Sequence, residues 1–292
     1  MSGGNGAAAV VRPGDDRPPD VTICIPHFQV KELMQLCLRA IRRYTTAPAY
    51  EVIVVDNGSR DESLDWLRSV GWVRLVERGD ETPENWVLAM STALDRGLAL
   101  ARGRYYLILH SDTIVKSAAW LPSLVALLEE NERVASAGSG KLERRGAVAR
   151  LLRSATDFKR LRIRFERGVL RKPFDPVRHR ALLPREGCPR DYCAIYRTEV
   201  LREHGLSFVQ KEGYTAGETV YRDLKSLGYE TRILPVERMM ELVDHIAHAT
   251  GAILPDRELE DRRVLRKTRR KLRRLFARGD VEDLLADASL DR

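Results

Sequence analysis

Two carboxylates in this sequence come directly after apolar runs that are typical of buried strands. Asp112 ends the triplet His110-Ser111-Asp112 after the run 105–109, and Asp56 follows the run 52–55. Ligands of open α/β sheets bind just beyond the carboxyl ends of the strands. A carboxylate placed there can hold a divalent cation through oxygen, and the cation can hold a diphosphate. Taken alone, Asp112 is better explained as a helix N-cap or an ordinary turn residue.

The elements that would position these carboxylates alternate regularly along the first half of the chain. Strands are predicted at 21–25, 52–55, 73–76 and 105–109, and helices at 31–45, 61–69, 84–101 and 117–130. This alternation, with continuous apolar strands, predicts a mostly parallel, Rossmann-like α/β sheet flanked by helices. No G-x-G-x-x-G follows the first strand and no P-loop motif is present, which argues against a dinucleotide site and against a P-loop nucleotidase.

The second half of the chain is less regular. Short strands are predicted at 193–196 and 231–234, and a helix at 217–228. A basic amphipathic helix is predicted at 257–278, followed by an acidic tail that we expect to pack weakly. A further strongly basic segment covers 141–180. Residues 1–19 are rich in small residues and proline, so we expect them to be disordered.

The composition favours an anionic partner. The 292 residues include 50 Lys and Arg against 42 Asp and Glu, a formal net charge of +8, which suits phosphate-rich small molecules, nucleic acid or an anionic membrane. The four cysteines show no Cys-x-x-Cys spacing, so we expect reduced thiols and no zinc site. No signal peptide and no membrane-spanning run is visible, and the expected location is cytoplasmic.

Four motifs together resemble family 2 glycosyltransferases, which have the GT-A fold. They are the strand 21–25 with Pro26-His27, the segment Val54-Val55-Asp56-Asn57-Gly58-Ser59, the long helix from Asn85 to the turn at 101–105, and Leu109-His110-Ser111-Asp112-Thr113. The last motif falls where the family carries its metal-binding D-x-D. This chain departs from that pattern because His110 replaces the first aspartate.

The resemblance implies a nucleotide-diphosphate sugar donor and a divalent cation, Mn²⁺ or Mg²⁺. Asp112 is the expected metal ligand, and His245 is a second ligand or a structural histidine. Asp61 is either a helix cap or a ligand. The residues expected to line the nucleotide site are Pro26, His27, Asp56, Asn85, His110 and Ser111. His110 could donate to a sugar or ribose hydroxyl.

An inverting transfer needs a base for the acceptor hydroxyl. In the family this base is a carboxylate at the start of a helix in the second half, often within a Glu-Asp pair. Glu218 occupies that place, with Glu212 in reserve, but the aspartate partner is missing. The alternative is that Glu218 merely complements a helix N-terminus.

The expected protein is thus an inverting, metal-dependent glycosyltransferase that acts on a hydroxyl of a glycan or lipid-linked acceptor. Residues 20–130 would bind the nucleotide and 131–255 the acceptor, with 256–292 as a basic helical extension. That extension either binds an anionic membrane surface or packs on the protein. Two alternatives remain: a non-catalytic nucleotide-sugar binder, and a protein that binds nucleic acid or membrane. Nucleic acid is disfavoured because the basic segments lack interleaved aromatic residues.

Overall fold

A single large sheet organises the computed structural model, which describes residues 9–83, 85–142, 168–169, 187–211, 214–254 and 262–292. The strand order is β3-β2-β1-β4-β7-β6-β8. These strands are β1 (Val21–His27), β2 (Tyr50–Asp56), β3 (Val73–Glu77), β4 (Tyr105–Leu109), β6 (Val134–Ser139), β7 (Cys193–Arg197) and β8 (Glu230–Leu234). All neighbouring strands are parallel except β7, which runs antiparallel to β4 and β6. The mixed α/β fold with a mostly parallel sheet is therefore confirmed.

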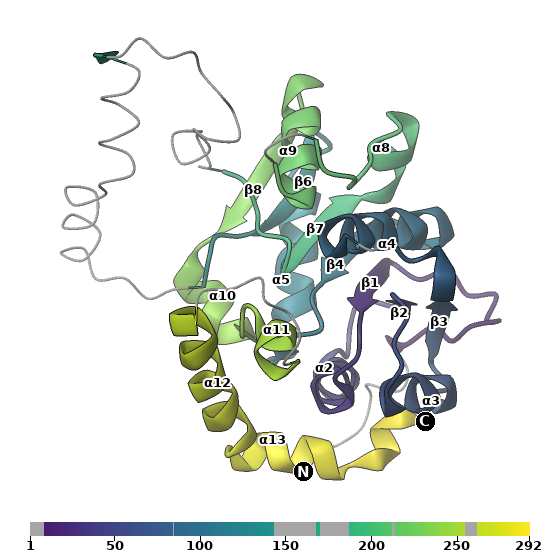
Figure 1. The fold of residues 1–292 in the computed structure, drawn as a ribbon. Coiled ribbons are helices and arrows are strands. Elements are labelled where there is room, and N and C mark those ends of the chain that lie inside the picture. The colour runs from purple at the N-terminus through teal and green to yellow at the C-terminus, as the bar shows by residue number, and fades with distance from the viewer. Residues whose placement is uncertain (1–8, 84, 143–167, 170–186, 212–213, 255–261) are drawn as a thin grey trace.

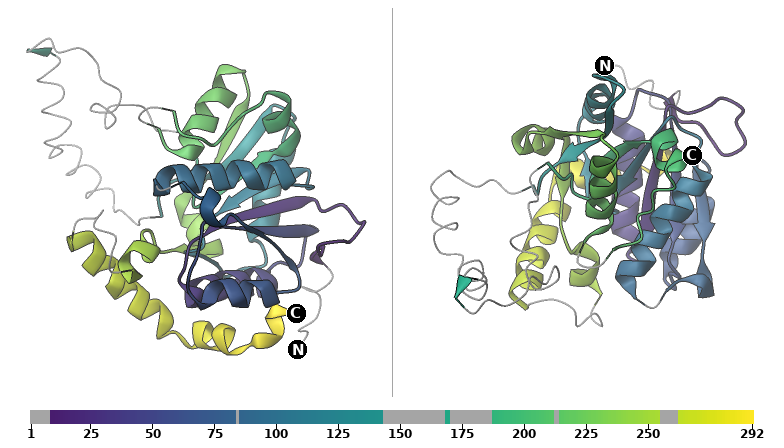
Figure 2. Two further views of the ribbon diagram at one scale, coloured as in Figure 1. Left: turned by 45° about the vertical axis from the view of Figure 1, so that its right-hand side comes forward. Right: turned by 90° about the horizontal axis from the view of Figure 1, so that it is seen from above.

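Helices cover both faces of this sheet (Figures 1 and 2). One face carries α4 (Trp86–Leu100), α8 (Thr198–Glu203) and α9 (Ala216–Ser226). The other face carries α2 (Lys31–Tyr44), α3 (Glu62–Ser69) and α5 (Trp120–Glu129). The remaining helical elements are α10 (Val236–Leu242), α11 (Ala249–Ile253), α12 (Arg262–Phe276), α13 (Gly279–Ala286) and the 3₁₀ turns η1 (Gly79–Glu81) and η3 (Ala288–Asp291).

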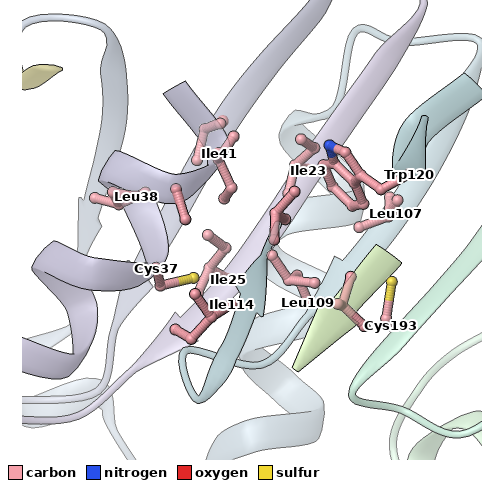
Figure 3. Packing of buried hydrophobic residues seen from close by; sticks show 14 of the residues in the cluster. Ile23, Ile25, Cys37, Leu38, Ile41, Leu107, Leu109, Ile114, Trp120 and Cys193 are labelled. Carbon is pink, nitrogen blue, oxygen red and sulfur yellow. The ribbon is translucent and has the colours of Figure 1, made fainter. Parts of the chain in front are cut away.

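The strands send alternate side chains to two separate apolar clusters, as the two-residue period of a strand requires. Leu107 and Leu109 of β4 join the cluster under α2 and α5, whereas Tyr106 and Ile108 join the cluster under α4 and α9. Figure 3 shows the first cluster, in which Trp120 of α5 packs beside the strands. Burial of each such side chain contributes about 1.5–3 kcal/mol, so the sheet is a rigid base for the loops at its carboxyl edge.

The N-terminal segment is partly ordered, contrary to our expectation of disorder across 1–19. Val10 forms a bridge with Tyr50 at the start of β2, and the Val11 N–H donates to the Tyr50 carbonyl at 2.7 Å. Both valines are buried. Two consecutive valines provide the apolar surface that anchors this segment, while residues 1–8 lie outside the described part of the chain.

The acidic tail also packs more firmly than expected. Arg39 of α2 is 4% exposed and makes two hydrogen bonds with the carboxylate of Asp291, at 2.8 and 2.7 Å. Trp66 donates to the same carboxylate at 3.0 Å, and Trp72 donates to the Leu290 carbonyl at 2.9 Å. Residues 279–291 therefore brace α2 and α3 from outside, as the yellow segment in Figure 1 shows.

Candidate functional site

Three side chains that could bind a metal ion lie together just beyond β4. The ligand atoms of His110, Asp112 and His245 all lie within 4.8 Å of one another. The Oδ1 atom of Asp112 is 3.3 Å from Nε2 of His245 and 3.9 Å from Nδ1 of His110. Among the residues that the structure describes, no other group of His, Cys, Asp and Glu side chains has this spacing.

Asp112 and His245 are far apart in the sequence, and a second sheet brings them together. Its two strands, β5 (Thr113–Val115) and β9 (Val243–His245), are antiparallel, with Thr113 opposite His245. The Asp112 carbonyl accepts a hydrogen bond from the Ile246 N–H at 3.0 Å, and its Oδ2 atom accepts one from the Ala249 N–H at 3.4 Å. Because the segment that carries His245 also holds both backbone and carboxylate of Asp112, the relative position of the two ligands is fixed.

The electrostatics of this cluster suit a cation. Burial lowers the pKa of His110 to about 4, so its imidazole is neutral near pH 7. Burial alone would raise the pKa of Asp112, but its interactions with His245 and His110 and the hydrogen bond from the Ala249 N–H outweigh this effect, so the pKa is lowered and the carboxylate is ionised. The His110 Nε2, His245 Nε2 and Asp112 Oδ1 atoms are buried without a hydrogen-bond partner. Such atoms normally find a partner, and a divalent cation would supply one.

Tyr192, which was not singled out in the sequence, contacts two of these ligands. Its ring stacks on His245 with the centroids 4.5 Å apart. Its carbonyl accepts hydrogen bonds from the His110 N–H at 3.0 Å and from the Thr113 hydroxyl at 3.1 Å. Tyr192 precedes β7, and no local motif marks it, because its role depends on the pairing of β7 with β4.

Two of the residues that we expected to bind the nucleotide near β1 and β2, Asp56 and His27, make hydrogen bonds within the protein. The buried Asp56 carboxylate accepts hydrogen bonds from the N–H groups of Gly58 and Ser59 at 3.0 Å. The buried ring of His27, which directly follows the half-buried Pro26, lies with Nε2 2.8 Å from the Ser63 hydroxyl. Burial lowers the pKa of His27 to about 4, so this ring is neutral.

Two further expected nucleotide residues differ in how available they are. Asn85 is the N-cap of α4, and its Oδ1 atom accepts from the N–H groups of Val87 and Leu88 at 2.9 and 3.2 Å. Ser111 lies between the ligands His110 and Asp112 and is half-buried. The side-chain oxygen of Asn85 is thus already used to cap α4, whereas Ser111 lies in the turn between two of the candidate metal ligands.

Two other carboxylates noted in the sequence lie at the amino ends of helices. Asp61 is the N-cap of α3 and accepts from the Ser63 N–H at 3.2 Å, so the expected cap is confirmed. Glu218 lies in the first turn of α9, whose N-cap Thr215 accepts from the Glu218 N–H at 3.4 Å. Glu218 is 3% exposed, and its Oε1 atom is 3.8 Å from Nη2 of Arg222.

A second carboxylate, Asp191, lies at the same helix start and was missed in the sequence. Its Oδ1 atom accepts from the Gly217 N–H at 3.1 Å, and it hydrogen-bonds to Thr215. The reserve base Glu212 and nearly all of the basic segment 141–180 lie outside the described residues.

Comparison with known proteins identifies the family. The model of "Glycosyl transferase family 2" matches residues 22–205. A "PGL/p-HBAD biosynthesis glycosyltransferase" from Mycobacterium bovis and its counterpart from Mycobacterium tuberculosis are 30% identical over 118 residues, 39% of this chain. The alignment covers 43% of these relatives, so it spans less than half of their length.

A solved structure shares the fold over nearly the whole chain. It is a mannosyltransferase from Pyrobaculum calidifontis, in complex with GDP-Man and Mn²⁺. Its TM-score is 0.51 at 17% sequence identity, and the match covers 97% of this chain and 85% of that one. The family match and the shared GT-A fold lead to one conclusion: this chain belongs to glycosyl transferase family 2.

Proposed function

We propose that this protein is a divalent-cation-dependent, inverting glycosyltransferase that takes its sugar from a nucleotide-diphosphate donor. The observation that carries the proposal is the cluster of His110, Asp112 and His245, with its buried, unpartnered ligand atoms. A cation held there would act as a Lewis acid for the charge that builds on a diphosphate leaving group. Two imidazoles and one carboxylate fit Mn²⁺ better than Mg²⁺, which prefers oxygen ligands.

The chain's own residues would orient the donor around this cluster. Pro26, His27 and Asp56 lie at the carboxyl ends of β1 and β2, next to β4 in the sheet, and would line the base and ribose. Ser111, between the two ligands of the turn after β4, would meet the diphosphate. At the amino end of α9, Glu218 or its neighbour Asp191 would take the proton of the acceptor hydroxyl.

The proposed acceptor is a hydroxyl of a glycan or of a lipid-linked molecule. Two observations support it: the names of the mycobacterial relatives, which refer to PGL/p-HBAD biosynthesis, and the basic surface of α12. The apolar side of α12 is buried at Leu272 and Leu275, whereas its arginines and lysines are exposed. That surface could hold the enzyme at an anionic membrane. Among the described residues, no helix has both the length and the apolar character needed to cross a bilayer.

A nucleotide titration tests the donor site. UDP, GDP, dTDP and CDP would each be titrated by calorimetry into the protein, with and without Mn²⁺. We expect one diphosphate to bind tightly, with a requirement for the metal. Asp112→Ala should weaken this binding by at least about tenfold, the usual scale of changes at a metal site, whereas Asp283→Ala on the exposed side of α13 should not.

The same titration separates the alternatives. Absence of nucleotide binding under every condition would contradict the proposal, and nucleic-acid or membrane binding through the basic surface would become the leading function. Metal-dependent nucleotide binding without any donor turnover would instead indicate a non-catalytic nucleotide-sugar binder.

A further inference from the structure

The aspartate that the sequence lacks after Glu218 has no substitute at position 219. Thr219 is buried, and its hydroxyl accepts from the Lys211 N–H at 3.3 Å. Glu218 itself is almost fully buried and faces the guanidinium of Arg222, which stacks over the ring of Tyr214 at 4.3 Å. A carboxylate with little access to solvent and a cationic neighbour is poorly placed to receive a proton from a substrate.

Asp191 places a second carboxylate beside Glu218 from a different part of the chain. Its Oδ1 atom accepts from the Gly217 N–H at 3.1 Å. This contact requires a glycine, since a Cβ atom at position 217 would lie 2.2 Å from that oxygen. Unlike Glu218, Asp191 is half-buried rather than fully buried, and the Gly217 N–H holds its carboxylate in place. The Glu-Asp pair absent from the sequence is thus restored in space.

The topology puts Asp191 at the edge of the sheet that carries the metal cluster. Leu109, the last residue of β4, pairs with Cys193, the first residue of β7. Because these strands are antiparallel, the chain leaves β4 through His110 at the same edge where it enters β7 through Asp191 and Tyr192. Tyr192 contacts two of the cluster residues, so Asp191 is the immediate sequence neighbour of a residue that contacts the cluster.

Resting on the proposed function, we propose that Asp191 is the catalytic base, and that Glu218 supports it from the first turn of α9. The Asp191 carboxylate would accept the proton of the acceptor hydroxyl. The acceptor oxygen would form a bond to the anomeric carbon. The bond from that carbon to the diphosphate oxygen would break, and its electron pair would leave with the nucleoside diphosphate.

The surroundings of Asp191 suit this task. Partial burial raises its pKa to about 6, against the hydrogen bonds from Gly217 and Thr215 and the charge of Arg190, and with the charge of Glu218 adding to the rise. Cys188 and the buried Tyr196 hydroxyl also face this carboxylate. A base works best when its pKa is near the operating pH. Since only the ionised form accepts a proton, the rate should fall as the pH decreases through about 6.

The test compares three isosteric variants: Asp191→Asn, Glu218→Gln and, as a matched control on the same helix, Asp223→Asn. The measured rate is the release of nucleoside diphosphate from UDP-glucose, UDP-GlcNAc, GDP-mannose, dTDP-glucose and CDP-glucose in the presence of Mn²⁺, with water as the acceptor. Asp191→Asn keeps an oxygen for the Gly217 N–H but cannot accept the proton. We expect its rate to fall by about 10²- to 10⁴-fold, with unchanged Mn²⁺-dependent nucleotide affinity and unchanged Tm.

Two further results are expected if Asp191 is the base. Glu218→Gln should lose less activity than Asp191→Asn, and the acidic limb of the pH profile should disappear only in Asp191→Asn. If Asp191→Asn keeps at least a third of the wild-type rate while Glu218→Gln loses activity, Asp191 is only a cap of α9 and the inference is overturned. If the wild type releases nucleotide from no donor, the proposed enzymatic function fails as well, and the inference with it.

Discussion

The imidazole of His110 distinguishes this cation cluster from one built on two carboxylates. It brings a neutral nitrogen donor where the family pattern has an anionic oxygen, and its buried Nε2 atom has no hydrogen-bond partner. The cluster therefore carries a single formal negative charge, on Asp112, and two imidazoles. Nitrogen donors favour transition-metal ions over Mg²⁺, so one side chain would set which cation the site accepts.

Replacement of His110 by aspartate should therefore change metal preference. In His110→Asp, a second carboxylate would improve the competition of Mg²⁺ against Mn²⁺ by about tenfold or more. The free Mn²⁺ signal in electron paramagnetic resonance, followed during a Mg²⁺ titration, measures this without any turnover. His204→Asp, at an exposed histidine that contacts Tyr229 at 3.2 Å, is the control. An unchanged Mg²⁺ competition in His110→Asp would show that His110 does not bind the ion.

The sequence alone predicted the site residues that belong to local motifs. It did not predict those whose position depends on the pairing of distant strands. Asp112 and the cap Asp61 follow from local order along the chain, and the structure shows that cap. Asn85 was expected at the nucleotide, and the structure shows it as the N-cap of α4. Asp191 and Tyr192 are important only because β7 inserts beside β4. No spacing rule connects residues whose proximity is created by a long-range strand pair.

The secondary-structure elements also divide into those that local sequence predicts and those that depend on contacts between distant parts of the chain. Strand β6 (Val134–Ser139) was not predicted, because its Ala, Ser and Gly residues have low strand propensity, yet all six residues are buried between β7 and β8. Of the C-terminal helices, only α12 was predicted from its periodicity, and α13 lies in the acidic tail, for which no helix was predicted. The packing of this tail was not predicted either, because the contact of Asp291 with Arg39 joins residues at opposite ends of the sequence.

This contact should contribute strongly to stability. Asp291→Ala would leave the buried Arg39 guanidinium without its carboxylate, which typically costs about 3–5 kcal/mol. The control is Glu241→Ala, which breaks the exposed ion pair with Arg238 and should cost at most about 1 kcal/mol. Urea unfolding followed by circular dichroism measures both. Equal effects for the two variants would show that η3 is not a structural brace.

At the scale of the whole molecule, the arginine and lysine side chains of α12 remain exposed and form a basic surface. Leu272 and Leu275 of α12 pack inward, as the alternative of packing on the protein requires, while Val264 and the cationic residues stay exposed. Association with a membrane would therefore depend on charge and weaken with salt, rather than on insertion of apolar side chains.

A charge-removal variant tests this surface. Arg266, Arg270 and Arg274 would be changed together to glutamine, and the control would change Arg12, Lys225 and Arg238, which are equally exposed on other elements. At about 1 kcal/mol per charge, the α12 variant should bind phosphatidylglycerol vesicles about a hundredfold more weakly. Sedimentation with vesicles measures the change. A similar loss in both variants would show that net charge alone, and not this surface, drives the binding.

The position of β7 late in the sequence also has a consequence for how the chain folds. Strands β1 to β4 come from one continuous stretch of the chain, whereas β7, the neighbour of β4 on its other side, lies far from β4 in the sequence. Until β7 has paired with it, the open edge of β4, with the apolar run Tyr105–Leu109, resembles the unpaired edges through which chains associate. Aggregation during refolding should therefore compete with the insertion of β7, and dilution of the chain should favour the native sheet.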